Sequence, residues 1–296
     1  MEDEYLKNIQ SRAFDLLNYY LNERPDMISA GIVKEMQEAL HCDQRYAFMM
    51  LLAEYCQLNI FGSEEDKVMY YQFIDPAIHI LNVEDYKNDK YYASIKINPA
   101  KFGKWELLQK KYQPFEVFVC NDIAVNPDGR QVPQIGLFTE EFTYPALLEN
   151  GGIKMILTPN EIETMRQPIV EATGNVLAYG LGLGYFAFSV LQKENVKSLT
   201  IIENSAEEIE LFKKLILPQF PHADKLRIVQ ADAFEYAENQ MGKEQFDYVF
   251  TDLWHDILEG IPLYKKMKTY ENLSPNVNFS YRAEKSIQCY IERVEE

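Results

Sequence analysis

Several features that would identify a function at once are missing from this chain of 296 residues. It has only four cysteines, and none of them forms a Cys-x-x-Cys pair. That absence excludes the usual signatures of a structural zinc site and of a redox disulfide. We therefore expect free thiols in a reducing compartment. The four positions are Cys42, Cys56, Cys120 and Cys289.

Positive charge is also scarce in the sequence. There are 29 Lys and Arg residues against 46 Asp and Glu residues, which gives a formal net charge of -17. An acidic chain repels phosphate backbones, so electrostatics disfavours a nucleic-acid partner. A small-molecule substrate, a cationic one or a protein suits this charge better. The alternative is that the charge serves only solubility.

Long hydrophobic runs are absent as well. No apolar segment is long enough to cross a membrane, and the acidic start Met1–Glu4 lacks the basic and apolar regions of a signal peptide. We expect a soluble, cytoplasmic protein. The apolar fraction of 47% is ample for a sizeable core.

The sequence pattern predicts three parts. Residues 1–62 form a helical region, in which apolar residues recur at helical spacing between Leu6 and Tyr20. Residues 63–157 form a small α+β region with an antiparallel sheet, and 158–296 form a Rossmann-like domain. The predicted fold class is therefore α/β, preceded by an α-helical region and a small β-rich region.

The middle part has β-rich segments separated by turn residues. Strands are predicted at 91–97 and 115–119, a helix at 105–112, and a turn at Asn126-Pro127-Asp128-Gly129. No catalytic motif is present in this region. Its expected role is to cover one side of a cofactor site or to contact a partner.

From Thr158 onward, strands alternate with helices. Such alternation predicts a parallel sheet, whose ligands bind at the carboxyl ends of the strands. Two sequences typical of capping boxes, Thr158–Glu161 and Ser205–Glu208, open helices. The predicted strands are 176–179, 198–202, 226–229 and 246–251.

An apolar run ends in three alternating glycines, Gly180, Gly182 and Gly184, and a helical pattern starts at Tyr185. Glycines at a strand end let a ligand approach the backbone, and helix amides favour anionic or polar groups there. This turn predicts a nucleotide-like cofactor. The stretch Gly182–Ala187 also fits the dinucleotide pattern G-x-G-x-x-A, so an NAD-binding oxidoreductase is an alternative.

Three acidic residues follow the next three predicted strands in order: Glu203, Asp232 and Asp252. With the glycines, they make the segment from Thr158 to Ile257 resemble the class I S-adenosylmethionine-dependent methyltransferases, with distant similarity to the spermidine-synthase-like branch. The resemblance implies a strand order of 3-2-1-4-5. It also implies S-adenosyl-L-methionine as the cofactor and S-adenosyl-L-homocysteine as the product.

The resemblance implies roles for particular residues. Glu203 binds the ribose hydroxyls, and Asp232 with Ala233 meets the adenine. The segment Phe246–Asp252 closes the site and contributes to cofactor binding through Asp252. From its place directly after the glycines, Tyr185 would also cover the methionine part of the ligand.

For methyl transfer to a small molecule or protein, Asp252 and His255 are the candidate catalytic residues. Asp252 would orient or deprotonate the acceptor, and His255 has a suitable ordinary pKa for a base near neutrality. Trp254 would wall the pocket or stack on a cation.

Only 44 residues follow Asp252. They are predicted to hold a helix at 257–273, a strand at 277–281 and a helix at 283–294, whereas the family's sheet adds two further strands. The substrate side would then be completed by the N-terminal regions or by another subunit, such as the second chain of a homodimer. Two further alternatives remain open: a non-catalytic module that binds S-adenosylmethionine or its product, and a polyamine aminopropyltransferase.

Overall fold

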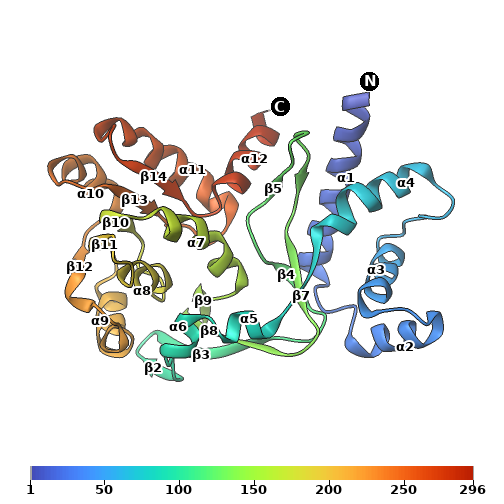
Figure 1. Cartoon of the computed structure of the whole chain (residues 1–296), viewed down its shortest axis with the longest axis horizontal. Coiled ribbons are helices and arrows are strands. Elements are labelled where there is room, and N and C mark those ends of the chain that lie inside the picture. The colour runs from blue at the N-terminus through green and yellow to red at the C-terminus, as the bar shows by residue number, and fades with distance from the viewer. Residues whose placement is uncertain (1, 296) are drawn as a thin grey trace. The chain divides into compact units, whose positions relative to one another are not determined.

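The computed structural model describes residues 2–295, which fold into two compact units (Figure 1). The helical unit comprises residues up to 85 together with 111–143. The α/β unit comprises 86–110 and 144 onward. The middle region expected at 63–157 is thus divided between the two units rather than standing as a part of its own.

Four helices build most of the helical unit. Along the first of them, Ile9, Ala13, Leu17 and Tyr20 are buried, which confirms the helical stripe predicted from their spacing. A π-helical turn, η1 (Tyr70–Ile74), follows the fourth helix. The helices are α1 (Glu2–Glu23), α2 (Ala30–Leu40), α3 (Gln44–Tyr55) and α4 (Glu64–Met69).

The strands of the helical unit are short. β7 pairs in parallel with β1 on one side and antiparallel with β4 on the other, while β5 and β6 form a hairpin. The predicted turn Asn126–Gly129 joins this hairpin, with Gly129 at φ +83°. The bounds are β1 (Ile78–Leu81), β4 (Val117–Val119), β5 (Ala124–Val125), β6 (Gln131–Val132) and β7 (Ile135–Phe138).

Two predictions for the middle region were wrong. Residues 105–112, predicted as a helix, form strand β3 (Trp105–Tyr112), in which buried Trp105 and Leu107 alternate with more exposed neighbours. Residues 91–97, predicted as a strand, instead contain helix α6 (Lys90–Ser94). The carboxylate of Asp89 accepts a hydrogen bond from the Tyr91 backbone N–H at 2.8 Å and so caps that helix.

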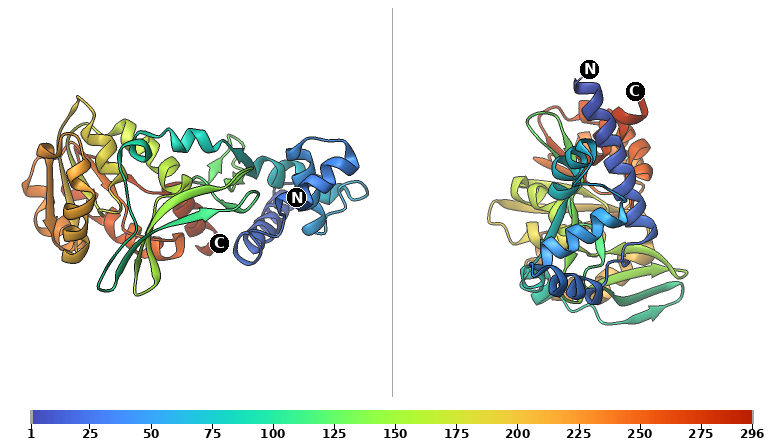
Figure 2. Two further views of the ribbon diagram at one scale, coloured as in Figure 1. Left: turned by 90° about the horizontal axis from the view of Figure 1, so that it is seen from below. Right: turned by 90° about the vertical axis from the view of Figure 1, so that its right-hand side faces the viewer.

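A four-stranded sheet has the order β2-β3-β8-β9. Its long strands are drawn in shades of green in Figure 2. The division between the units falls within its two longest strands, β3 and β8. The edge strand β9 of this sheet contributes residues to the wall of the cavity described below. The other strands are β2 (Ala100–Phe102), β8 (Phe142–Glu149) and β9 (Gly152–Ile156).

The centre of the α/β unit is a five-stranded sheet in which every pairing is parallel. Its order is β12-β11-β10-β13-β14. The expected α/β class with a parallel sheet is therefore confirmed. The strands are β10 (Gly174–Tyr179), β11 (Val196–Glu203), β12 (Leu226–Gln230), β13 (Tyr248–Thr251) and β14 (Asn278–Tyr281).

Helices cover both faces of this sheet (Figure 1). On one face, Leu177 and Val249 belong to a buried apolar cluster with residues of α10, α11 and α12. On the other face, Phe250 stacks on Phe186 of α8 with ring centroids 4.3 Å apart. The helices are α7 (Pro159–Glu171), α8 (Tyr185–Leu191), α9 (Ala206–Leu215), α10 (Ala233–Asn239), α11 (Ile257–Thr269) and α12 (Glu284–Glu295).

The two predicted capping boxes form only in part. Ser205 Oγ accepts a hydrogen bond from the Glu208 backbone N–H, which caps α9. The Thr158 side chain makes no capping hydrogen bond, although Pro159 opens α7 as expected. Glu161 instead extends toward an arginine at the site.

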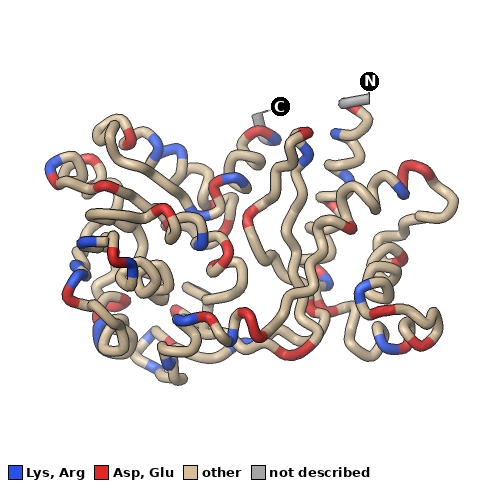
Figure 3. The backbone as a smooth tube through the Cα atoms, in the orientation of Figure 1, with Lys and Arg blue, Asp and Glu red and all other residues tan. Residues whose placement is uncertain are grey.

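In the described part of the chain, β14 is the last strand, and α12 follows it. None of the described helices is both long and apolar enough to cross a bilayer. Lys and Arg positions are scattered among Asp and Glu along the backbone (Figure 3).

Candidate functional site

A cavity of about 540 Å³ opens at the carboxyl ends of the five parallel strands. This is the end of the sheet where ligands bind in open parallel α/β folds, and the volume suits a nucleoside-sized ligand. Residues of β9 and α7 complete its wall. The lining segments are 153–157, 180–186, 202–204, 231–234 and 252–255, with Glu161, Met165, Glu208, Phe250, Leu263 and Arg282.

The three glycines of the turn all have positive φ, but they are glycine for different reasons. A Cβ on Gly180 would lie 2.0 Å from the Asp252 carbonyl oxygen, and one on Gly184 would lie 2.5 Å from the Phe212 ring. A Cβ on Gly182 would meet nothing closer than 4.0 Å. Packing therefore explains the first and third glycines, whereas Gly182 leaves free space at the cavity wall.

Glu203 ends β11 and is 9% exposed. Its Oε2 accepts a hydrogen bond from the Leu181 backbone N–H at 3.3 Å, and its Oε1 accepts one from Ser205 at 2.9 Å. These bonds fix the carboxylate beside the glycine turn. Each oxygen has a second lone pair, so Glu203 can still accept hydrogen bonds from a ligand.

Asp232 caps α10. Its Oδ1 accepts hydrogen bonds from the backbone N–H groups of Phe234 and Glu235, both at 2.9 Å. Asp232 and the buried Ala233 both line the cavity. The structure thus gives Asp232 a capping role at the place where the sequence predicts an adenine contact.

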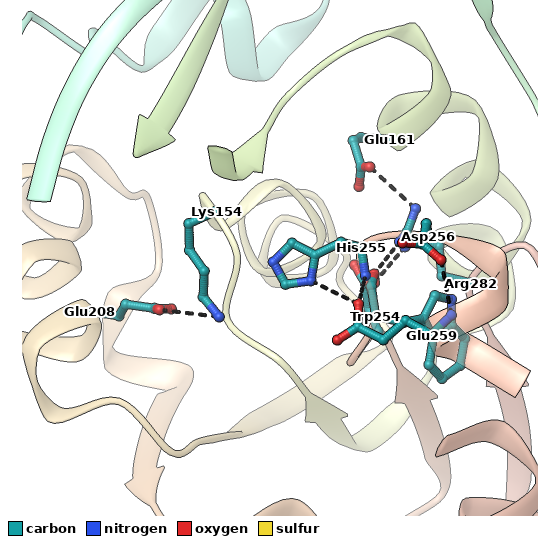
Figure 4. Close-up of polar contacts among 9 residues, drawn as sticks. Lys154, Glu161, Glu208, Trp254, His255, Asp256, Glu259 and Arg282 are labelled. Carbon is teal, nitrogen blue, oxygen red and sulfur yellow. Dashed lines mark hydrogen bonds and ion pairs between the residues drawn. The ribbon is translucent and has the colours of Figure 1, made fainter. Parts of the chain in front are cut away.

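Asp252 is paired with a buried arginine. Arg282 directly follows β14, is 5% exposed and donates from Nε to Asp252 Oδ1. The same guanidinium donates to Glu161 Oε1 at 3.2 Å and to the Trp254 carbonyl oxygen. Arg282 therefore joins the ends of β13 and β14 to the first turn of α7 (Figure 4).

Burial raises the pKa of Glu161. The positive charge of Arg282 counteracts this rise, and the negative charge of Asp252 adds to it. The arrangement therefore contains two carboxyl groups that compete for one guanidinium at the cavity wall.

His255 lies at the cavity wall next to Asp256, which caps α11. Its backbone N–H donates to Glu259 Oε2 at 2.9 Å, and its Nδ1 lies 3.2 Å from the same oxygen. A carboxylate oxygen can only accept, so Nδ1 carries the hydrogen. This pairing leaves Nε2 as the proton acceptor of the ring. Figure 4 shows the ring and its partner.

The two aromatic candidates, Tyr185 and Trp254, are more buried than their predicted roles at the ligand suggest. Tyr185 lines the cavity, but its hydroxyl donates to Asp89 at 3.0 Å and it is 6% exposed. Trp254 is 3% exposed and packs against Gly260, where a Cβ would lie 2.9 Å from the indole. The structure shows no cation on the Trp254 ring among the described contacts.

Sequence reasoning missed four residues that the fold brings to the cavity or its edge. Two of them, Glu161 and Glu208, are the last residues of the predicted capping boxes. The sequence therefore suggested helix capping for them and no role at the cavity. Arg282 and Glu259 carried no motif at all. The four are Glu161, Glu208, Glu259 and Arg282.

The charged residues of the cavity give it a negative formal balance. Five carboxyl groups face two basic groups across the lining. A bound dinucleotide would bring its pyrophosphate into this field, whereas a sulfonium compound would bring a positive charge. The set consists of Glu161, Glu203, Glu208, Asp232 and Asp252, with Lys154 and Arg282.

No protein-family model matches the chain, and no curated protein matches it either. Among solved structures, the chain is similar to spermidine synthase from Thermotoga maritima, at 19% identity over 62% of this chain and a TM-score of 0.34. It is also similar to two structures of the methyltransferase domain of bacterial CtHen1 over 37% of this chain, at 13% and 15% identity and TM-scores of 0.26 and 0.27. The chain spans just over half the length of each, 55%, 53% and 54% respectively.

Proposed function

We propose that the cavity binds S-adenosyl-L-methionine and that the protein transfers its methyl group to a small molecule or a protein. One observation carries the proposal: an acid-lined cavity lies at the carboxyl ends of the parallel strands, with open space at Gly182. A cationic sulfonium suits this field, and the pyrophosphate of NAD does not.

The residues present fit the parts of this cofactor. Gly182 would admit it close to the backbone, and Glu203 has remaining acceptor capacity for ribose hydroxyls. Ala233 offers a small apolar surface for the adenine, beside Asp232. The release of S-adenosyl-L-homocysteine would follow transfer.

The bound cofactor supplies an electrophilic methyl group, and its sulfur keeps the electron pair of the broken bond. His255 would accept the proton of the acceptor at Nε2, because Glu259 holds the hydrogen on Nδ1. Asp252 would hold its position at the cavity wall through Arg282. Alignment of the two reactants and exclusion of water would supply most of the rate.

A non-catalytic binding module is the second candidate. The pairing of Asp252 with Arg282 favours it, because that carboxylate is already engaged in an ion pair. Aminopropyl transfer is a third candidate, because decarboxylated S-adenosylmethionine is also a cationic sulfonium that suits the acidic cavity. The ligand that binds more tightly, S-adenosylmethionine or its decarboxylated form, distinguishes methyl transfer from aminopropyl transfer.

Calorimetric titration of the full chain tests the proposal. We expect S-adenosylmethionine and S-adenosylhomocysteine to bind and NAD to fail. Gly182→Ala should weaken binding at least tenfold, because its Cβ enters the free space. Gly103→Ala is the matched control: its φ of +58° is close to the +57° of Gly182, and a Cβ there also has open surroundings.

The results separate the candidates. Tighter binding of decarboxylated S-adenosylmethionine would favour aminopropyl transfer. Binding without product across a panel of small-molecule and protein acceptors would favour the binding module. If S-adenosylmethionine, its product and its decarboxylated form all fail to bind, all three assignments fail.

A further inference from the structure

Glu208, in the first turn of α9, lines the cavity, and the capping of that helix does not explain its side chain. It is 4% exposed, and among the described residues its Oε2 has no hydrogen-bond partner. Its Oε1 lies 3.9 Å from Lys154 Nζ on β9, which is an ion-pair distance but too long for a hydrogen bond. Figure 4 shows the two side chains pointing toward one another.

A buried carboxyl group with an unpartnered oxygen is costly, because it loses its water without gaining a hydrogen bond. The neighbouring acid differs in this respect: both oxygens of Glu203 accept backbone hydrogen bonds. Capping of α9 requires only the backbone N–H of Glu208, which donates to Ser205. The side chain is therefore not needed for the helix.

The charges around Glu208 come from four other segments. Burial raises its pKa to about 7, and Glu203 and Glu149 add to the rise. Lys154 and Lys104 act in the opposite direction. These charges leave Glu208 shared between its neutral and ionised forms near neutral pH.

We propose that Glu208 and Glu203 form a two-carboxyl subsite that receives a hydrogen-bond-donating group of the ligand, and that Glu208 releases a proton when this group binds. The inference rests on the proposed function, in which the donor group is the ribose diol of S-adenosylhomocysteine. Glu203 accepts from the diol with its remaining lone pairs, and Glu208 supplies the second acceptor.

The proton balance follows from the donor's chemistry. A hydroxyl donates a hydrogen bond most strongly to an ionised carboxylate. The proton that Glu208 carries in the free protein therefore leaves to the buffer, and the ribose hydroxyl keeps its own. At pH 7, a fraction of a proton should be released for each ligand bound.

Titration of the full chain with S-adenosylhomocysteine at pH 7, in two buffers with different heats of ionisation, measures this proton directly. We expect release by the wild-type protein, none by Glu208→Gln, and an affinity of Glu208→Gln about tenfold lower. Between pH 6 and 8 the wild-type affinity should rise, because the ionised form binds, while that of Glu208→Gln should stay flat.

Glu207→Gln is the matched control, since Glu207 precedes Glu208 on the same helix and its side chain is 59% exposed. It should bind with the affinity and proton release of the wild-type protein. Proton uptake, or equal behaviour of wild type and Glu208→Gln, would overturn the subsite while leaving the proposed function intact. A wild-type protein that does not bind S-adenosylhomocysteine would instead overturn the proposed function.

Discussion

At the scale of single residues, the glycine turn combines two tightly packed positions with one open position within five residues. Gly180 and Gly184 allow strands and rings to approach, and only Gly182 faces free space. The sequence shows three equivalent glycines, but the structure separates two that packing requires from one that lies beside open space.

Gly180→Ala should strongly destabilise the protein. Its Cβ would lie 2.0 Å from the carbonyl oxygen of Asp252, and φ is +97°. We expect a loss of at least about 3 kcal/mol in the free energy of unfolding, from the backbone clash and the strained φ. Urea unfolding measures it, and a loss no larger than that of Gly103→Ala would contradict the packing explanation.

The pairing of His255 with Glu259 makes a spectroscopic prediction. In the wild-type protein, the neutral ring should carry its hydrogen on Nδ1, because the carboxylate oxygen only accepts. Glu259→Ala, which removes the acceptor, should shift the tautomer toward Nε2–H, the form that free histidine prefers. NMR of ¹⁵N-labelled histidine reports this, with His255→Gln to assign the signal.

The exposed Glu238 on α10 provides the control, since Glu238→Ala should leave the His255 signal unchanged. An Nε2–H tautomer in the wild-type protein would contradict the proposed role of His255 as proton acceptor at Nε2.

At the scale of elements, Arg282 connects two neighbouring strand ends with a helix start. It links β13, β14 and α7 through Asp252, Trp254 and Glu161. The fifth strand therefore contributes a charge to the site although it lies at the edge of the sheet.

Arg282→Ala should lower the free energy of unfolding by about 3 kcal/mol, because two carboxyl groups lose their shared partner at a buried position. Adding Glu161→Gln should recover part of the loss by removing one of those groups. Chemical denaturation of the three proteins measures both effects.

Arg166→Ala is the comparison, because Arg166 forms an ion pair with Glu163 while its own side chain is 56% exposed. Exposed pairs contribute at most about 1 kcal/mol. If Arg282→Ala lowers the free energy of unfolding by no more than Arg166→Ala does, the ion pairs of Arg282 do not stabilise the fold.

The elements also show which sequence signals are reliable. The long helix at 2–23 and the parallel strands follow from periodicity, because many residues repeat the same pattern. The eight residues of β3 were predicted as a helix, because a segment this short fits both periods. In the sheet, β3 lies between β2, which directly precedes it in sequence, and β8, which is 30 residues further along. Whether such a segment becomes a helix or a strand depends on the strands that it can pair with in the fold.

At the scale of the whole molecule, we expect a ligand to change the stability of one compact unit and not of the other. The cavity is lined by residues of the α/β unit alone. A ligand that binds there should stabilise that unit by mass action. Hydrogen exchange with and without S-adenosylhomocysteine should show protection at 180–184 and 203–205, with amides of α1 to α3 unchanged.

Equal protection of both units would contradict this expectation. Gly182→Ala provides the control, because protection should require a tenfold higher ligand concentration in that variant, whereas Gly103→Ala should behave as the wild type.

The sequence by itself determined the alternation of strands and helices, the glycine turn, and the acidic residues Glu203, Asp232 and Asp252 at the cavity. These are local signals: hydrophobic periodicity and turn chemistry act over a few residues. Only the tertiary structure decided that Arg282 engages Asp252, that Glu259 orients His255 and that Glu208 joins the cavity. The physical reason is that ion pairs and orphaned carboxyl groups depend on which chain segments meet, and parallel strand pairing brings together residues separated by tens of positions.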